Sequence, residues 1–182
     1  NYASRVLIPA FKKAGANLTT IVTSGGVSAM YHGKKNGFAI ASTDMELALN
    51  EPTDTVVIAT QHNLHASQVS AALNKGKHVF VEKPLALVHS DINAIEAKQK
   101  LSNNLLMVGY NRRFAPQIQK IKELISTKPV PKTFIITVNA GSIEADHWTQ
   151  NIALGGGRII GEACHFIDLM RFLVGAEIMS FK

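Results

Sequence analysis

The chain has 182 residues, of which 46% are hydrophobic and 18% charged, a globular composition that excludes an intrinsically disordered protein. The net charge is +6, but the basic residues are scattered and not interleaved with aromatic side chains, so we expect no nucleic-acid partner. No apolar run is long enough to span a membrane, and the single cysteine, Cys164, excludes an internal disulfide and favours a cytoplasmic protein.

The first 109 residues alternate between segments typical of helices and of strands. The expected helices are Ser4–Ala14, Val27–Lys35, Met45–Asn50 with Thr43 or Asp44 as its cap, Leu64–Asn74 and Ser90–Leu101. The expected strands are Leu18–Thr23, Phe38–Ala41, Thr55–Thr60, His78–Glu82 and Leu105–Gly109. Because these strands lack polar alternation, the sequence predicts a parallel sheet covered on both faces by helices. We expect the strands that contain Leu18, Val56, Val79 and Leu106 to be adjacent.

The pattern changes near Tyr110. The expected elements are an amphipathic helix over Pro116–Ser126, a linker over Thr127–Lys132, a strand over Phe134–Asn139, an apolar helix from Gly155 to about Leu173, and a strand over Glu177–Phe181. One or two strands do not make a stable sheet, so we expect this second domain to be incomplete or to be completed by another chain. The predicted domains are therefore residues 1–109 and 110–182.

The start of the chain resembles the second half of a phosphate-binding turn. A dinucleotide-binding unit begins with a strand, a glycine-rich turn and a helix, whereas here a helix comes almost at once. Asn1, Tyr2 and Ala3 would lie in that turn, with Ala3 at the third glycine position, and the free N–H groups of the helix start would receive the pyrophosphate. An ordinary helix start is the alternative for these three residues taken alone.

Four motifs, in this order and spacing, resemble the glucose–fructose oxidoreductase, inositol dehydrogenase and rhizopine catabolism (Gfo/Idh/MocA) family over essentially the whole chain. They are Thr60–His65, Gly76–Pro84 with its Glu82-Lys83-Pro84, Gly109–Phe114 and Gly155–Leu169. The last also resembles the subgroup fused behind a zinc-type alcohol dehydrogenase domain. The resemblance implies an α/β fold, a Rossmann-like parallel sheet without its first strand and glycine turn, followed by the first part of an α+β substrate domain. It also implies a chain truncated at both ends.

The resemblance implies catalytic roles for Lys83 and His165. Lys83 follows a parallel strand, at the edge where open α/β sheets bind ligands, and an ammonium there can stabilise a developing alkoxide. Pro84 biases Lys83 towards an extended conformation. His165 is the expected general acid–base, and a core histidine bonded to a carbonyl is the alternative.

The sequence departs from the family next to His165. An aspartate commonly stands four residues before this histidine, where this chain has Gly161. Glu162, three residues before His165, could reach the same pocket and act as a third catalytic residue, or it could pair with Arg158, which shares its helical stripe. Asp168 matches the family's final aspartate and is interpreted as a structural hydrogen-bonding group.

Further positions match residues that approach the cofactor in the family. His62 stands where asparagine is usual, Gln61 replaces a proline, and Ser24 falls near the ribose. Ser24 with Gly25 and Gly26 leaves room for a 2′-phosphate, with Lys34 or Lys35 as its candidate partner, so the cofactor is expected to be NAD or NADP. The full set of expected cofactor-binding residues is Asn1, Tyr2, Ala3, Ser24, Thr60, His62, His65, Glu82, Lys83, Asn111 and Arg112, and no metal site is expected.

The resulting hypothesis is an NAD(P)-dependent oxidoreductase that transfers a hydride between nicotinamide and a secondary alcohol of a sugar or polyol, although the 182-residue chain by itself is expected to be inactive. A non-catalytic nucleotide-binding sensor or regulatory module of the same fold is the alternative, which Gly161 keeps open. A domain that binds nothing is disfavoured by the intact Glu82-Lys83-Pro84. The resemblance also implies a homo-oligomer formed through the second domain and no membrane partner.

Overall fold

The computed structural model describes residues 2–128 and 130–181 and has an α/β architecture. The first helix is a π-helical turn, η1 (Ala3–Leu7), continued by α1 (Ile8–Lys13), and Gly15 follows it with a φ of 87°. The strands and helices that come next are β1 (Thr20–Val22), α2 (Gly26–Asn36), β2 (Ile40–Ser42), α3 (Met45–Asn50), β3 (Thr55–Ile58), α4 (His62–Asn74), β4 (His78–Val81), α5 (His89–Leu101) and β5 (Leu106–Val108). These agree with the expected elements, and Asp44 is the cap of α3 because its carboxylate accepts from two backbone N–H groups.

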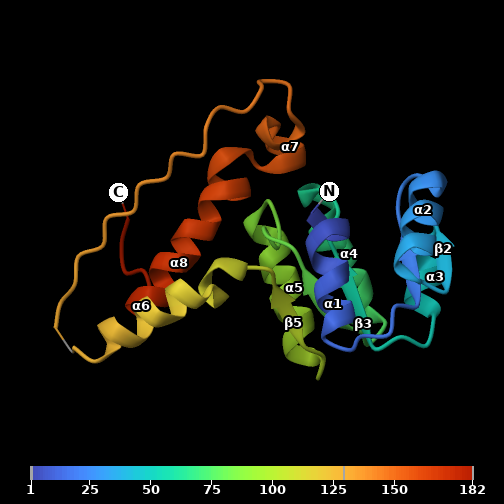
Figure 1. Cartoon of the computed structure of the whole chain (residues 1–182), viewed down its shortest axis with the longest axis horizontal. Helices are drawn as coiled ribbons and strands as arrows, with labels where there is room; N and C mark the ends of the chain where they lie inside the picture. The colour runs from blue at the N-terminus through green and yellow to red at the C-terminus, as the bar shows by residue number, and fades with distance from the viewer. Residues whose placement is uncertain (1, 129, 182) are drawn as a thin grey trace.

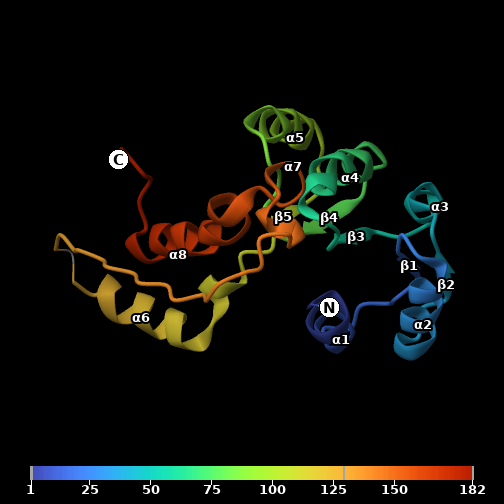
Figure 2. The same ribbon diagram turned by 90° about the horizontal axis from the view of Figure 1, so that it is seen from above.

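Strands β3, β4 and β5 form a parallel sheet in that order, which confirms the expected adjacency of the strands that contain Val56, Val79 and Leu106. Helices α4 and α5 lie on one face and α1 on the other, where Phe11 packs edge-on against Phe80 (Figure 2). Ile58, Val79 and Val81 of these strands are buried in the core, and Val81 is fully buried. Because all strands run the same way, their carboxyl ends meet at one edge of the sheet.

Strands β1 and β2 make a separate two-stranded parallel sheet. In Figures 1 and 2 it lies with α2 and α3 to one side of the larger sheet. The expectation that the strand near Leu18 would adjoin the Val56 strand was therefore wrong. Among the described residues no strand hydrogen bonds join the two sheets, because β1 pairs with β2 alone.

The second half of the chain is built mainly from helices. A 3₁₀ turn, η2 (Asn111–Phe114), leads into α6 (Pro116–Ser126), and after a long extended segment come η3 (Trp148–Gln150), α7 (Ile152–Gly155), η4 (Ile159–Ala163) and α8 (Cys164–Val174). Helices α6 and α8 lie side by side in both views, and the ammonium of Lys122 on α6 donates to the Leu173 carbonyl at 3.1 Å (Figures 1 and 2). Gly156 and Gly157, both at positive φ, make the turn that precedes η4.

The expected apolar helix from Gly155 onwards is present but differs in detail from the expectation. It contains a π-helical turn at η4, and within η4 and α8 the buried residues are Gly161, His165, Leu169 and Leu173, one every four positions. Ile159, at the start of η4, is 73% exposed. The π turn changes the angular spacing of the side chains over Ile159–Ala163 from that of the α-helix assumed in the sequence analysis.

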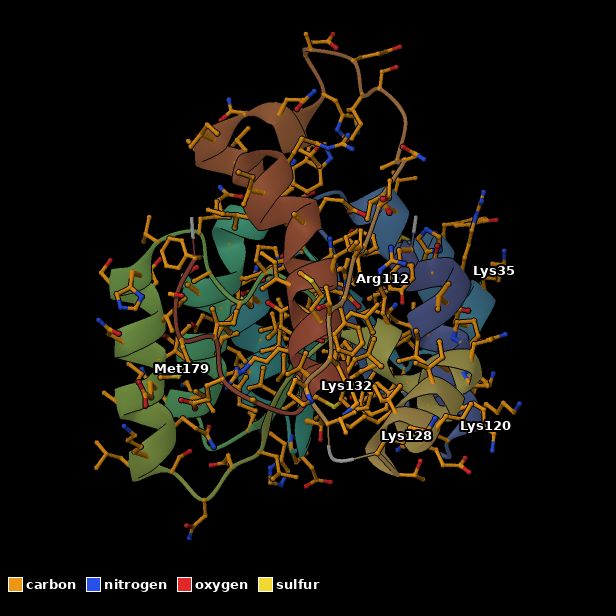
Figure 3. All side chains as sticks on the ribbon, turned by 90° about the vertical axis from the view of Figure 1, so that its left-hand side faces the viewer. Lys35, Arg112, Lys120, Lys128, Lys132 and Met179 are labelled. Carbon is orange, nitrogen blue, oxygen red and sulfur yellow. The ribbon has the colours of Figure 1, made fainter. Side chains whose placement is uncertain are left out.

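Two expected strands, Phe134–Asn139 and Glu177–Phe181, are not formed. The structure gives them no neighbouring strand to satisfy their backbone groups, and Ile135 and Phe181 are about nine-tenths exposed. Within the described ranges, no helix is long and apolar enough to cross a bilayer. Three of the basic side chains labelled in Figure 3 come from separate elements: Lys35 from α2, Arg112 from η2 and Lys120 from α6.

Candidate active site

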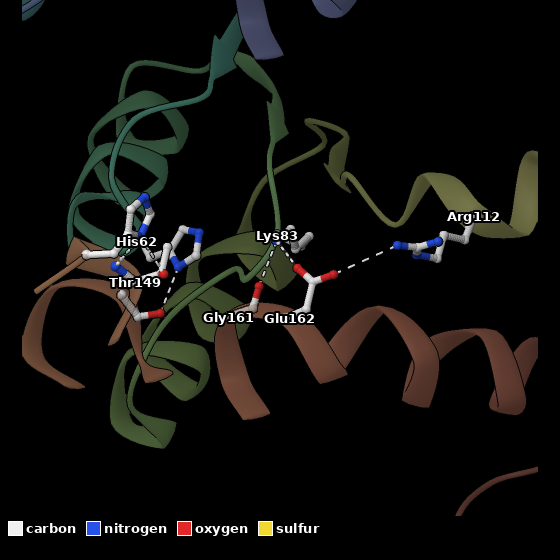
Figure 4. A network of polar contacts seen from close by, with 8 residues as sticks. His62, Lys83, Arg112, Thr149, Gly161 and Glu162 are labelled. Carbon is white, nitrogen blue, oxygen red and sulfur yellow. Dashed lines mark hydrogen bonds and ion pairs between the residues drawn. The ribbon is translucent and has the colours of Figure 1, made fainter. Parts of the chain in front are cut away.

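The Lys83 side chain connects the two halves of the chain. It follows β4 at the carboxyl edge of the sheet, and its ammonium donates to the Gly161 carbonyl at 2.7 Å (Figure 4). The peptide bond between Lys83 and Pro84 is cis. The ammonium also lies 3.9 Å from a carboxylate oxygen of Glu162, and only 15% of the Lys83 side chain is exposed. A mostly buried cation is thus held beside one carbonyl and one carboxylate.

Glu162 faces Lys83 rather than Arg158. Its other carboxylate oxygen lies 3.8 Å from the guanidinium of Arg112, so it bridges two cations that come from β4 and from η2 (Figure 4). Of the two alternatives left open by the sequence, the geometry agrees with the pocket and not with the Arg158 ion pair. Arg112 is further held over the ring of Phe166 at 4.4 Å.

Gly161 has no room for a side chain. A Cβ atom there would lie 2.9 Å from the Gly155 carbonyl oxygen and 3.4 Å from the imidazole of His62. The imidazole of His62 therefore lies next to the place that a side chain at position 161 would occupy. In the family that the sequence resembles, asparagine is usual at the position of His62. The carboxylate nearest to Lys83 is provided by Glu162, one position further along the helix.

His165 is buried on the same helix, with 8% of its surface exposed. Burial first, and then the charges of Lys83 and Arg112, lower its pKa to about 4, so the imidazole is neutral near neutral pH. Its Nδ1 atom is buried without a hydrogen-bond partner. Glu162 therefore does not hold the ring in one tautomer through a hydrogen bond, although its negative charge opposes the lowering of the pKa.

His62 and His65 lie in the first turns of α4, below the ends of β3 and β4. Nδ1 of His62 is 2.8 Å from the Gly155 carbonyl, and the Trp148 ring lies edge-on to the imidazole at 4.8 Å. Burial, followed by the charge of Lys83, lowers the pKa of His62 against the opposing effect of its bond to Gly155. Nδ1 of His65 is 2.7 Å from the Pro84 carbonyl, and this residue is completely buried.

The expected cofactor-binding residues are distributed unevenly. Thr60, Glu82, Asn111 and Arg112 all follow strands of the larger sheet, and the Asn111 amide donates to the Tyr2 hydroxyl at 3.0 Å, which brings the first helix to the same edge. Ser24 is exposed beside the separate β1–β2 sheet, Ala3 is half-buried in η1, and Asn1 lies outside the described residues. His65 lies below the surface of the site.

Glu82 and Gly109 approach each other closely at the ends of β4 and β5. A Cβ atom at position 109 would meet the Glu82 carboxylate at 3.0 Å, so a larger residue there would require this side chain to shift. Burial raises the pKa of the Glu82 carboxyl group, against the opposing effects of its hydrogen bond and charge contact with Lys83.

The sequence interpretation missed Tyr110 and Trp148. The Tyr110 ring lies edge-on to the His165 imidazole at 6.2 Å, and burial raises its pKa to about 12. Because Tyr110 lies directly before Asn111 in the third motif, its position in the sequence could have indicated a place in the site. Trp148 carries no motif, and only the fold of the segment before α7 brings it to His62.

A parallel sheet with charged side chains gathered at its carboxyl edge is the arrangement of nucleotide-binding α/β proteins. The family model described as the oxidoreductase family with an NAD-binding Rossmann fold (GFO_IDH_MocA) matches residues 1–110. The chain belongs to the Gfo/Idh/MocA oxidoreductase family.

Curated relatives are named as dehydrogenases. The chain is 33% identical over 143 residues to scyllo-inositol 2-dehydrogenase (NAD(+)) of Bacillus subtilis (76% of this chain, 41% of the relative), and 28% identical over 146 residues to myo-inositol 2-dehydrogenase of Thermotoga maritima (80% and 43%). It therefore spans about two fifths of the length of these relatives.

Solved structures agree with this assignment. A levoglucosan dehydrogenase in complex with NADH and levoglucosan matches with a TM-score of 0.76 and 28% identity over 86% of this chain and 44% of its own. An aldose–aldose oxidoreductase from Caulobacter crescentus complexed with glycerol matches with a TM-score of 0.80 and 27% identity (97% and 55%).

Proposed function

We propose that the protein is an NAD(P)-dependent dehydrogenase that oxidises a secondary alcohol of a sugar or polyol. The observation that carries the proposal is the contact of Lys83, at the end of β4, with Gly161 and Glu162 of the helix that also carries His165. A cation, a carboxylate and a neutral imidazole are thereby brought to one edge of a nucleotide-binding sheet. Relatives named inositol and levoglucosan dehydrogenases support the substrate class.

Each residue has a distinct role in this proposal. The Lys83 ammonium stabilises the negative charge that develops on the alcohol oxygen as its proton leaves. The neutral His165 imidazole accepts that proton. Glu162 lies between Lys83 and Arg112 and fixes both cations while balancing their charge. The nicotinamide supplies the redox chemistry when bound, by accepting the hydride from the alcohol carbon.

The polar groups at the carboxyl edge of the sheet fit a dinucleotide. The Tyr2 hydroxyl, which accepts from Asn111, and the Arg112 guanidinium offer donors to hydroxyl and phosphate groups. The exposed Thr60 hydroxyl donates to the Gln68 side chain at 2.7 Å and can accept from a ribose hydroxyl. We assign these residues, with Glu82 and Lys83, to cofactor binding. Ser24 and the neighbouring glycines leave NAD and NADP both open, because no acidic residue stands there to bond a ribose.

Four expectations from the sequence stay predictions. They are the domain division between residues 109 and 110, a homo-oligomer formed through the second domain, a cytoplasmic location and a fused zinc-type alcohol dehydrogenase domain. Size-exclusion chromatography with light scattering of the full-length gene product tests the oligomer.

The proposal is tested by turnover of the full-length gene product with NAD and NADP against a panel of inositols and aldoses. Lys83→Ala is expected to lower kcat by about a hundredfold or more, the scale of a positioned catalytic group. His165→Ala is expected to lower kcat similarly while changing cofactor affinity, measured by calorimetry, much less. The exposed Lys100 on α5 provides the control Lys100→Ala, which should keep wild-type turnover.

A non-catalytic nucleotide-binding module is the second candidate. The features that favour it are the missing carboxylate at Gly161 and the low pKa of His165, which makes the imidazole a weak base. Cofactor binding without turnover of any alcohol in the panel would support this candidate over the dehydrogenase.

A further inference from the structure

His65 is a fully buried histidine whose two ring nitrogens both face backbone carbonyls. Nδ1 lies 2.7 Å from the Pro84 carbonyl and Nε2 lies 3.2 Å from the Thr60 carbonyl. A carbonyl oxygen can only accept, so the ring is the donor in the short contact with Pro84. None of the residue's surface is exposed, so these contacts are made within the protein.

The two carbonyls belong to the segments that leave adjacent strands. Thr60 follows β3, and Pro84 follows β4 immediately after Lys83. Between them, Glu82 donates its backbone N–H to the Ile58 carbonyl at 2.9 Å, which is the last main-chain bond joining these two strands. Beyond that bond, the His65 ring lies against both departing segments, and on the Thr60 side Gln68 of α4 also accepts from the Thr60 hydroxyl at 2.7 Å. The Pro84 carbonyl is the contact that His65 makes on the Lys83 side.

We propose that His65 is a positioning residue for Lys83, which it serves by holding the Pro84 carbonyl. This inference rests on the proposed catalytic role of Lys83. It replaces the cofactor contact expected for His65 from the sequence, because a residue without exposed surface has no face to offer a ligand.

The physical argument concerns how the Lys83 ammonium is aimed. Its bond to Gly161 spans 78 positions of the chain and joins the sheet to the helix of His165. The backbone of Lys83 is fixed on its N-terminal side by β4 and on its C-terminal side by the bond from His65 to the Pro84 carbonyl. Displacement of a catalytic group by about 1 Å can cost a hundredfold in rate, so loss of this bond is expected to affect turnover.

Two amide substitutions separate the contacts. The amide nitrogen of His65→Asn takes the place of Nδ1 and keeps a donor for the Pro84 carbonyl. That of His65→Gln takes the place of Nε2, faces the Thr60 carbonyl and leaves the Pro84 carbonyl without a donor. In the full-length gene product, His65→Asn is expected to keep kcat within about threefold of wild type, and His65→Gln to lower it by about tenfold or more with an unchanged KM for the cofactor. His78→Gln is the matched control, because His78 contacts the main chain at the opposite end of β4.

Crystal structures of the two variants provide a readout that is independent of activity. The proposal expects the distance from the Lys83 ammonium to the Gly161 carbonyl to stay near 2.7 Å in His65→Asn and to exceed hydrogen-bonding reach, about 3.5 Å, in His65→Gln. Equal kcat and equal distances in both variants would overturn it. Wild-type protein that turns over no alcohol would instead refute the dehydrogenase, while the two distances would still decide the role of His65.

Discussion

At the scale of single residues, the position of Gly161 is restricted by the neighbouring backbone. Any side chain there meets the backbone oxygen of Gly155 at 2.9 Å, and backbone yields less easily than the end of a flexible side chain. Gly161→Ala is expected to lower the free energy of unfolding by about 1–3 kcal/mol, the usual range for overpacking. Gly26→Ala is the control, since its Cβ would meet its nearest neighbour at an ordinary 3.8 Å. Urea unfolding of both variants measures the difference, and equal midpoints would contradict the prediction.

His165 makes stability depend on pH. Its pKa is about 4 in the folded protein and near 6.5 in an unfolded chain, so between these values the unfolded chain binds a proton that the folded protein does not. The free energy of unfolding should therefore fall as the pH drops from about 6.5 towards 4 and level off below. His62, whose pKa is also lowered, acts in the same direction. Urea midpoints between pH 7 and pH 4 should decline less steeply for His165→Gln, and an unchanged slope would show that His165 does not contribute.

At the scale of elements, one ion pair fastens η2 to α8. Arg113 donates through Nε at 3.0 Å and through Nη2 to the two carboxylate oxygens of Asp168, whose side chain is 10% exposed. Asp168→Ala is expected to lower the free energy of unfolding by about 2–3 kcal/mol, because hydrogen bonds between charged groups are lost at a mostly buried site. Glu177→Ala removes an exposed pair with Arg171 and should cost under about 1 kcal/mol. Thermal unfolding of the two variants should separate them, and similar losses would contradict the prediction.

The elements could be predicted from the sequence where local pattern and tertiary partner agree. Short apolar runs predicted β3, β4 and β5, whose neighbouring strands are present. The same kind of pattern predicted a strand at Phe134–Asn139, which the structure leaves without a partner. In the site, motifs singled out Lys83 and Glu162. The burial of His65 and the approach of Trp148 depend on packing between distant segments, which no local pattern encodes.

At the scale of the whole molecule, the two sheets are expected to differ in local stability. Every residue of β1 and β2 is at least partly exposed, whereas Val79 and Val81 of β4 are buried between α1 and the α4–α5 layer. A two-stranded sheet with little buried surface opens more easily than a covered three-stranded one. Hydrogen exchange followed by mass spectrometry should therefore show loss of protection in β1 and β2 well before β4. Equal protection would mean that the two sheets unfold as one unit.

The candidate site is anchored mainly on main-chain atoms. Lys83 bonds the carbonyl of Gly161, His62 that of Gly155, and His65 that of Pro84. An acceptor that every amino acid possesses places no demand on the identity of the residue that carries it. Correlated substitution between pairs of positions detects partners through their side chains, so it would not detect these contacts. The arrangement of the site would have to be found from coordinates rather than from an alignment of related sequences.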